Sequence, residues 1–327
     1  MTARWRGGAA AVAAVAVNGA VEHPEMQGAR PSRTALGAAA HRAAHQILEH
    51  GAIFSDPLAL KILGDEAGAA IRRATAEPAL RGLRLFIAAR TRFAEDAVTA
   101  AIAQGTGQVV VLGAGLDTYS YRASVADGVR IFEVDHPATQ AWKRAQLDAA
   151  AIAIPATLTF APVDFESESL DIGLRAAGFD SQRSSFFTWL GVVPYLSEPA
   201  VLATLRWIAG QPGGARVIFD YANPPVGVAR DPRAAAIERL AARVARIGEP
   251  IRSWYETTAL LEMLAAMGLD AVEDIGPAEI AARYGTGKLP RGSPALDHHT
   301  GHDNRGDHDN RGGHIVHAAS VSRRAPA

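Results

Sequence analysis

A glycine turn between two apolar runs is the part of this sequence best suited to bind a nucleotide. Gly113 and Gly115 follow the run 108–112, and Asp135 ends the next run, 22 positions after Gly113. Glycine lets a ligand approach the backbone because no Cβ intervenes, and an acid at this spacing can accept hydrogen bonds from both ribose hydroxyls. The pattern predicts a nucleoside-bearing cofactor. The alternatives are a purely structural turn and an Asp135 that caps a helix starting near Pro137.

Asp117 and Thr118 narrow the choice of cofactor. A dinucleotide enzyme favours a third glycine or alanine where Thr118 stands, and its pyrophosphate would lie beside Asp117. A carboxylate there repels a phosphate but suits the ammonium and sulfonium of S-adenosyl-L-methionine. The turn thus favours a methyl donor, and an NAD(P)-dependent oxidoreductase remains the alternative.

A third pair of candidate binding residues follows the apolar run 157–161. Asp164 could accept a hydrogen bond from the exocyclic amine of adenine, and Phe165 could flank its ring. Such sites combine a flat apolar wall with a few polar anchors. The alternative is that Asp164 caps a helix while Phe165 packs in the core.

Alternating strands and helices must position these residues. Strands are predicted at 108–112, 130–134, 157–161, 185–190, 215–221, 270–275 and 314–320, and helices at 137–150, 168–177, 198–209 and 257–267. This alternation predicts an α/β fold with a mainly parallel sheet and helices on both faces. The carboxyl ends of the strands then share one edge, so the loops after Leu112, Val134, Val163 and Trp189 should form the ligand site.

The segments flanking this core have other expected roles. Helices are predicted at 34–50, from Asp56-Pro57 and at 79–103, so residues 31–105 are expected to be helical and residues 106–327 to form the α/β core. The proline- and arginine-rich segment 223–253 is expected to be a helical lid over the same edge. Residues 1–30 are expected to be a disordered extension.

The overall composition excludes several classes of protein. Lysine and arginine total 33 against 34 acids, and this balance gives no basic surface for nucleic acid. The chain has no cysteine, which excludes disulfides, zinc-thiolate sites and cysteine nucleophiles and fits a cytoplasmic enzyme. The apolar stretch 9–17 is shorter than the roughly 20 residues that span a bilayer, so we expect no membrane association.

Taken together, these motifs resemble the leucine carboxyl methyltransferase family, in particular its bacterial branch of S-adenosyl-L-methionine-dependent methyltransferases. The matching segments are 32–35 (SRTA), 54–57 (FSDP), 90–93 (RTRF), 112–122 (LGAGLDTYSYR), 132–137 (FEVDHP), 163–165 (VDF), 189–196 (WLGVVPYL) and 212–214 (PGG). The resemblance covers about residues 32–275 and 314–320, and it rests mainly on the combination of LGAGLDT with FEVDHP.

The resemblance implies a seven-stranded class I methyltransferase sheet that binds S-adenosyl-L-methionine. It also implies that residues 31–105 form a helical cap on a Rossmann-like core at 106–327. It implies that Arg90 contacts the methionyl carboxylate of the cofactor or the substrate. By the same resemblance, Gly113 touches the cofactor, Asp135 holds the ribose, and Asp164 with Phe165 lies beside the adenine. Many family members carry Glu-Gly after the fourth strand, whereas this chain has Leu-Gly at 190–191. The resemblance therefore says less about the identity of the acceptor than about that of the cofactor.

The expected reaction is methyl transfer to an oxygen of a small or peptide-borne acceptor. A carboxylate is already ionised at neutral pH and needs no general base, whereas a phenol would benefit from one. No histidine is obviously placed for that role, and no catalytic residue can be assigned. Tyr195 could line the acceptor pocket or merely pack in the turn that holds it.

A histidine-rich segment gives a rival function, a non-enzymatic metal-binding protein. Residues 297–317 hold six of the 11 histidines, and imidazoles can ligate Zn, Ni or Cu. The segment is rich in glycine and has no apolar anchor that could support ligand geometry. We therefore expect a flexible loop at 297–313 that holds no metal site.

Overall fold

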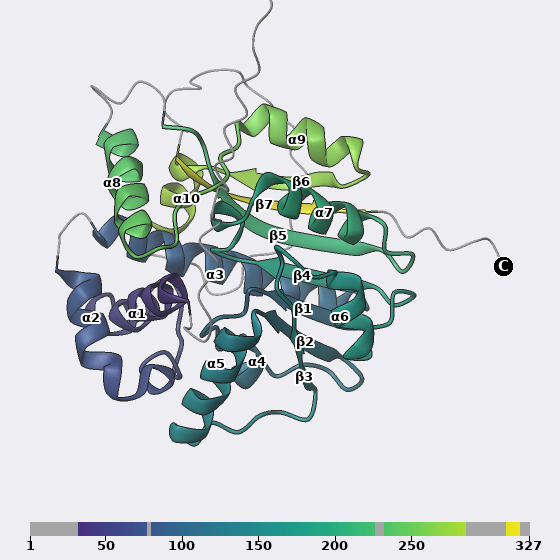
Figure 1. Cartoon of the computed structure of the whole chain (residues 1–327), viewed down its shortest axis with the longest axis horizontal. Helices are drawn as coiled ribbons and strands as arrows, with labels where there is room; N and C mark the ends of the chain where they lie inside the picture. The colour runs from purple at the N-terminus through teal and green to yellow at the C-terminus, as the bar shows by residue number, and fades with distance from the viewer. Residues whose placement is uncertain (1–31, 77–79, 226–231, 286–311, 321–327) are drawn as a thin grey trace, which may run out of the picture. The chain divides into compact units, whose positions relative to one another are not determined.

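The computed structural model describes residues 32–76, 80–225, 232–285 and 312–320, which form an α/β fold around one sheet (Figure 1). The predicted extension at 1–30 and residues 297–311 of the predicted histidine-rich loop lie outside the described residues. Within the described residues, no helix combines the length and the apolar character that crossing a bilayer requires.

The seven strands lie within one residue of their predicted positions. They are β1 (Gln108–Leu112), β2 (Arg130–Asp135), β3 (Leu158–Pro162), β4 (Ser185–Trp189), β5 (Ala215–Ala222), β6 (Asp270–Ile275) and β7 (Gly313–Ala319). Their order is β3-β2-β1-β4-β5-β7-β6. β1 to β5 pair in parallel, and β7 lies antiparallel between β5 and β6. The predicted fold class is confirmed.

Helices cover both faces of this sheet because its central strands are apolar on both sides. Val110 and Leu112 of β1 pack with α6 (Leu170–Ala176), α7 (Glu198–Ala209) and α9 (Thr257–Ala266). Val109 and Val111 pack with α3 (Leu80–Ala103) and α10 (Pro277–Tyr284). Figure 1 shows α7 in front of the strands and α3 behind them. α5 (Pro137–Ala149) packs against β2 and β3.

The remaining helices lie beside the carboxyl ends of the strands. They are α1 (Arg33–Leu48), the 3₁₀ helix η1 (Lys61–Glu66), α2 (Ala67–Thr75), α4 (Tyr119–Arg122), the 3₁₀ helix η2 (Val193–Tyr195) and α8 (Pro232–Arg246). α8 occupies the centre of the predicted lid segment, whose role as a lid stays a prediction.

The prediction that a helix begins at Asp56-Pro57 is wrong. Residues 57–60 form a turn, and the 3₁₀ helix begins only at Lys61. The Asp56 carboxylate accepts hydrogen bonds from the Leu58 N–H at 2.9 Å and the Thr118 hydroxyl at 2.7 Å. Asp56 thus closes its own turn and joins it to the segment after the glycine turn.

Candidate functional site

The glycine turn has a backbone that only glycine adopts easily. Gly113 has φ +62° and Gly115 has φ +44°, in the left-handed region where a Cβ is strained. A Cβ on Gly113 would overlap the side chain of Val192, and one on Gly115 would lie 2.9 Å from the Ala35 Cβ. The turn therefore brings bare backbone to the carboxyl end of β1, between α1 and the loop after β4.

Asp135 lies at the end of β2 and binds the glycine turn directly. Its Oδ2 accepts from the Gly115 N–H at 2.5 Å and its Oδ1 from the His136 N–H at 2.7 Å. Burial raises the pKa of Asp135, although these two donors and the Lys143 ammonium oppose the shift. The cap of α5 is His136, whose Nδ1 accepts from the Ala138 N–H. Asp135 therefore does not cap α5, and the helix-capping alternative for this residue is wrong.

Asp117 faces basic side chains. Arg42 Nη1 lies 3.9 Å from its Oδ2, and the Tyr119 N–H donates to its Oδ1 at 2.7 Å. Burial opposes the ionisation of Asp117, but the charge of Arg42, followed by those of Lys143 and Arg122, lowers its pKa below the ordinary value. Its negative charge is largely compensated, so the predicted repulsion of a phosphate is weaker than the sequence indicates.

Asp164 and Phe165 follow β3, as the sequence predicts. Asp164 Oδ1 accepts from the Glu166 N–H at 3.0 Å, and its Oδ2 accepts from the Ser167 hydroxyl at 2.7 Å. The ring of Phe165 packs 6.0 Å from that of Trp189, centroid to centroid. Asp164 therefore closes a turn and does not cap a helix, since the N-cap of α6 is Ser169, whereas Phe165 packs against the core as its structural alternative had it. Their contact with adenine stays a prediction.

Arg90 projects from α3 toward the loop after β4. Its Nη1 donates to Asp220 Oδ2 at 2.6 Å, and Asp220 Oδ1 accepts from the Gly191 N–H at 2.5 Å. Arg90 is buried, and its Nε has no hydrogen-bond partner among the described residues. The same loop carries Val192 against Gly113, so it connects Arg90 to the glycine turn.

Three of the predicted binding residues lie at the carboxyl ends of adjacent strands: Asp164 comes after β3, Asp135 ends β2 and Gly113 follows β1. The loop that carries Gly191 follows the next strand of the sheet, β4. The chain crosses from β3 back to β4 on the other side of β1, so the strand order reverses between β1 and β4. Open α/β sheets bind ligands at such a reversal, outside the carboxyl ends of the strands.

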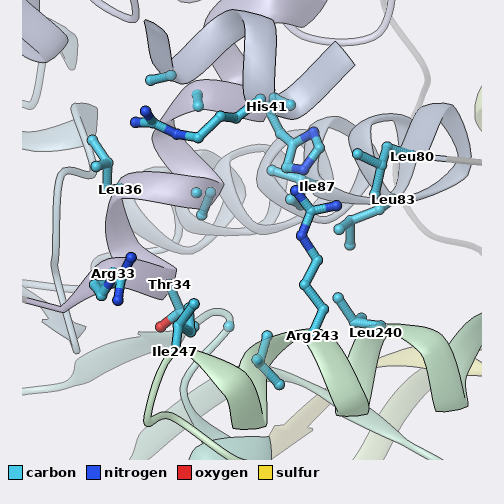
Figure 2. Close-up of a pocket in the computed structure, with 18 of the residues that line it drawn as sticks. Arg33, Thr34, Leu36, His41, Leu80, Leu83, Ile87, Leu240, Arg243 and Ile247 are labelled. Atoms are coloured by element: carbon cyan, nitrogen blue, oxygen red, sulfur yellow. The ribbon is translucent and has the colours of Figure 1, made fainter. Parts of the chain in front are cut away.

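A cavity of about 480 Å³ lies next to this row. Its walls come from α1, α2, α3 and α8, and Arg90 is one of the α3 residues that line it. Gly191 and Tyr195, which follow β4, complete the lining. Figure 2 shows Arg243 reaching from α8 toward the imidazole of His41 on α1. The volume of the cavity is that of a binding site for a small organic molecule.

His41 and Arg243 are site candidates that the sequence reasoning missed. His41 lies on the alanine-rich face of α1, where a polar side chain is the one available signal. Burial lowers its pKa to about 4, and the charges of Arg84, Arg243 and Arg90 add to the shift. The imidazole is therefore neutral at pH 7. Its place in a cavity depends on how α8 packs, which local sequence does not reveal.

Comparison with known proteins identifies the family to which this chain is similar. The family model described as leucine carboxyl methyltransferase matches residues 35–209, more than half of the chain. A Mycobacterium avium (strain 104) protein named "Putative S-adenosyl-L-methionine-dependent methyltransferase" is 33% identical over 291 residues, or 80% of this chain and 89% of that protein. Bacillus subtilis YktD, which carries the same description, is 31% identical over 194 residues. That match covers 59% of this chain and 63% of YktD, just under two thirds.

A solved structure has the same fold. It is described as a putative methyltransferase from Thermobifida fusca, and it superposes with a TM-score of 0.52 at 17% identity over 93% of this chain and 100% of that one. The chain belongs to the leucine carboxyl methyltransferase family. It is an S-adenosyl-L-methionine-dependent methyltransferase, as the sequence predicted.

Proposed function

We propose that this enzyme transfers the methyl group to an oxygen of a small or peptide-borne acceptor, and that a carboxylate suits it better than a hydroxyl. The observation that carries the proposal is the cavity beside Arg90 and Gly191, which adjoins the loop that contacts the glycine turn. An acceptor in this cavity can approach a donor held at the strand ends. Such alignment, with exclusion of water, is what displacement at carbon requires.

The titratable groups of the cavity support a carboxylate acceptor. His41 has a pKa of about 4, and burial raises the pKa of Tyr195 to about 12 against the opposing charge of Arg90. A general base acts best with a pKa near the working pH, so neither group is well suited to deprotonate a phenol. An ionised carboxylate needs no such help.

We further propose how the chain holds the donor. Asp135 would accept from the ribose hydroxyls with the lone pairs that Gly115 and His136 leave open. Arg90 would meet the methionyl carboxylate through its unpartnered Nε. S-adenosyl-L-methionine supplies the electrophilic methyl group when bound. The full set of proposed donor-binding residues is Arg90, Gly113, Gly115, Asp117, Asp135, Asp164 and Phe165.

Methyl transfer to oxygen is tested with labelled donor. The purified chain is incubated with [methyl-³H]S-adenosyl-L-methionine and a panel of carboxylic acids, phenols and carboxyl-terminal peptides. A carboxylate product releases its label as methanol in mild base, whereas an ether keeps it. Label on nitrogen or carbon in every active acceptor would contradict the proposal.

The rival functions predict other results. An NAD(P)-dependent oxidoreductase would bind NADH rather than S-adenosylhomocysteine in calorimetry. A metal-binding protein would lose its function on dialysis against chelator, whereas methyl transfer should persist. Among the described residues, no group of three or more His, Asp or Glu side chains could hold a metal ion. The cytoplasmic location expected from the sequence stays a prediction.

A further inference from the structure

Resting on the proposed function, we propose that the cavity between α1, α2, α3 and α8 is the acceptor site, and that it selects a small amphipathic anion. The anion would have an apolar body and one oxyanion head, recognised by Arg243 and His41. This assigns a ligand class to a cavity that adjoins the proposed donor-binding residues and shares Arg90 with them.

The charges that line the cavity are mainly positive. Arg33, Arg73, Arg90 and Arg243 line it, against the carboxylate of Glu66. Arg90 is held by Asp220, and Arg33, Arg73 and Glu66 are exposed at the rim. Arg243 is half-buried and extends toward His41 across the cavity (Figure 2). An oxyanion that enters between these two side chains meets a guanidinium donor, which forms strong charge-assisted hydrogen bonds.

His41 gives an independent indication of a ligand. It is 7% exposed and lines the cavity, yet its Nδ1 has no hydrogen-bond partner among the described residues. A buried ring nitrogen without a partner costs free energy that a bound polar atom can offset. The ring is neutral at pH 7, so one of its nitrogens carries a proton and can donate to an oxyanion. Arg243, one of the charges that lower the pKa of His41, also lines the cavity and would attract an anion.

Most of the remaining lining is apolar. Its large aliphatic side chains are Leu36 of α1, Leu80, Leu83 and Ile87 of α3, Leu240 and Val244 of α8, and Ile247 just after α8. An apolar body placed among them is removed from water, which is favourable in proportion to its area. A purely polar anion would not use these walls.

The segment after α8 is fixed to the cap, so the cavity has a defined wall. Glu249 accepts hydrogen bonds from the backbone N–H groups of Arg33 at 2.6 Å and Thr34 at 2.9 Å. The Arg252 N–H donates to the Pro194 carbonyl at 2.7 Å. These bonds join the end of α8 to the start of α1 and to the turn that carries Tyr195.

Three probes with the same eight-carbon chain test the head-group selectivity: octanoate, 1-octanol and octylamine. Each is titrated calorimetrically into the full chain, with and without saturating S-adenosylhomocysteine. We expect octanoate to bind about tenfold or more tightly than octanol, because a hydrogen bond between charged groups contributes more binding free energy than a neutral one. Octylamine should bind more weakly than octanol, because its ammonium is repelled by the arginines. Butanoate should bind more weakly than octanoate because it fills less of the apolar wall.

Variants identify the residues responsible. R243M should bring octanoate to the affinity of octanol, and H41L should weaken octanoate without affecting octylamine. The matched control is R246M, because Arg246 lies on the same helix but is exposed and outside the cavity. Retained binding of S-adenosylhomocysteine by R243M shows that the variant is folded.

The outcomes separate the two proposals. No octanoate binding, equal affinities for octanoate and octanol, or equal effects of R243M and R246M would overturn the acceptor site. If the head-group preference is found but no acceptor receives a methyl group on oxygen, the site stands and the proposed function fails. If methyl transfer to oxygen is found without any preference for anions, the proposed function stands and this inference fails.

Discussion

Arg42 of α1 donates a hydrogen bond to the Leu116 carbonyl at 2.5 Å and thereby joins the helical cap to the glycine turn. The same guanidinium lies 3.9 Å from Asp117 and 3.7 Å from Asp56. All of these groups are buried or half-buried, so the contacts are little screened by solvent. The glycine turn, which is the proposed donor site, is therefore held by α1 as well as by the sheet.

Replacing Arg42 should weaken donor binding. R42M removes the bond to Leu116 and leaves Asp117 with less compensation, so we expect about tenfold weaker binding of S-adenosylhomocysteine, in keeping with the loss of one charged hydrogen bond. Calorimetry gives the affinity, and urea titration gives the stability. R84M is the control, because Arg84 forms a comparable buried pair with Glu49 away from the turn. Equal loss of donor affinity in both variants would contradict the positioning role.

Gly113 should tolerate no side chain. G113A places a Cβ against Val192 at a φ of +62°, so both donor affinity and stability should fall. The left-handed backbone alone costs about 1–2 kcal/mol. G128A is the control, because Gly128 has φ +82° but open space around its Cβ position. If G113A binds S-adenosylhomocysteine as tightly as G128A does, the turn does not shape the donor site.

Asp135 should recognise the ribose as well as hold the turn. D135A should bind S-adenosylhomocysteine about tenfold or more weakly, because a hydrogen-bond acceptor for the sugar is lost. The 2′-deoxy analogue separates the two roles. It should bind more weakly than the parent compound to the wild type but equally well to D135A. A deoxy penalty that is unchanged in D135A would leave Asp135 with the structural role alone.

Glu249 should control access of the acceptor. E249A removes the carboxylate that accepts from the first N–H groups of α1, so the end of α8 loses its attachment to the cap. We expect a higher KM for the acceptor, an unchanged affinity for S-adenosylhomocysteine, and faster amide hydrogen exchange at Arg33 and Thr34. E249Q keeps one accepting oxygen and should lie between E249A and the wild type. Unchanged exchange in E249A would show that this attachment is not important.

Sequence reasoning was most reliable where local pattern and fold agree. β1 and β4 are buried on both faces, so their apolar runs mark them as central strands. Parallel pairing of β1 and β2 then brings Gly113 and Asp135 together, because Gly113 follows β1 and Asp135 ends β2. The compensation of Asp117 by Arg42 depends on a helix 75 positions earlier in the chain, which no local pattern indicates. The cavity at His41 similarly depends on the packing of α8.

Two buried histidines should make the protein less stable in mild acid. Burial lowers the pKa of His41 and of His317 to about 4, with neighbouring arginines adding to each shift, whereas the ordinary value is 6.5. Between these values the unfolded chain binds more protons than the folded one, so the free energy of unfolding falls as the pH drops from about 6.5 to about 4. At pH 5.5 the loss should be about 1.4 kcal/mol for each histidine.

Urea titrations at pH 7.5, 6.5 and 5.5 measure this slope, and H317L tests its origin. His317 lies in β7 against the Phe186 ring, and its Nε2 has no partner among the described residues, so leucine removes the titrating group from an apolar site. The difference between H317L and the wild type should shift in favour of H317L by about 1.4 kcal/mol between pH 7.5 and pH 5.5. Parallel pH profiles for the two proteins would mean that His317 is not held neutral by the fold. Octanoate bound beside His41 should raise the pKa of that imidazole alone, because a nearby anion favours its protonated form.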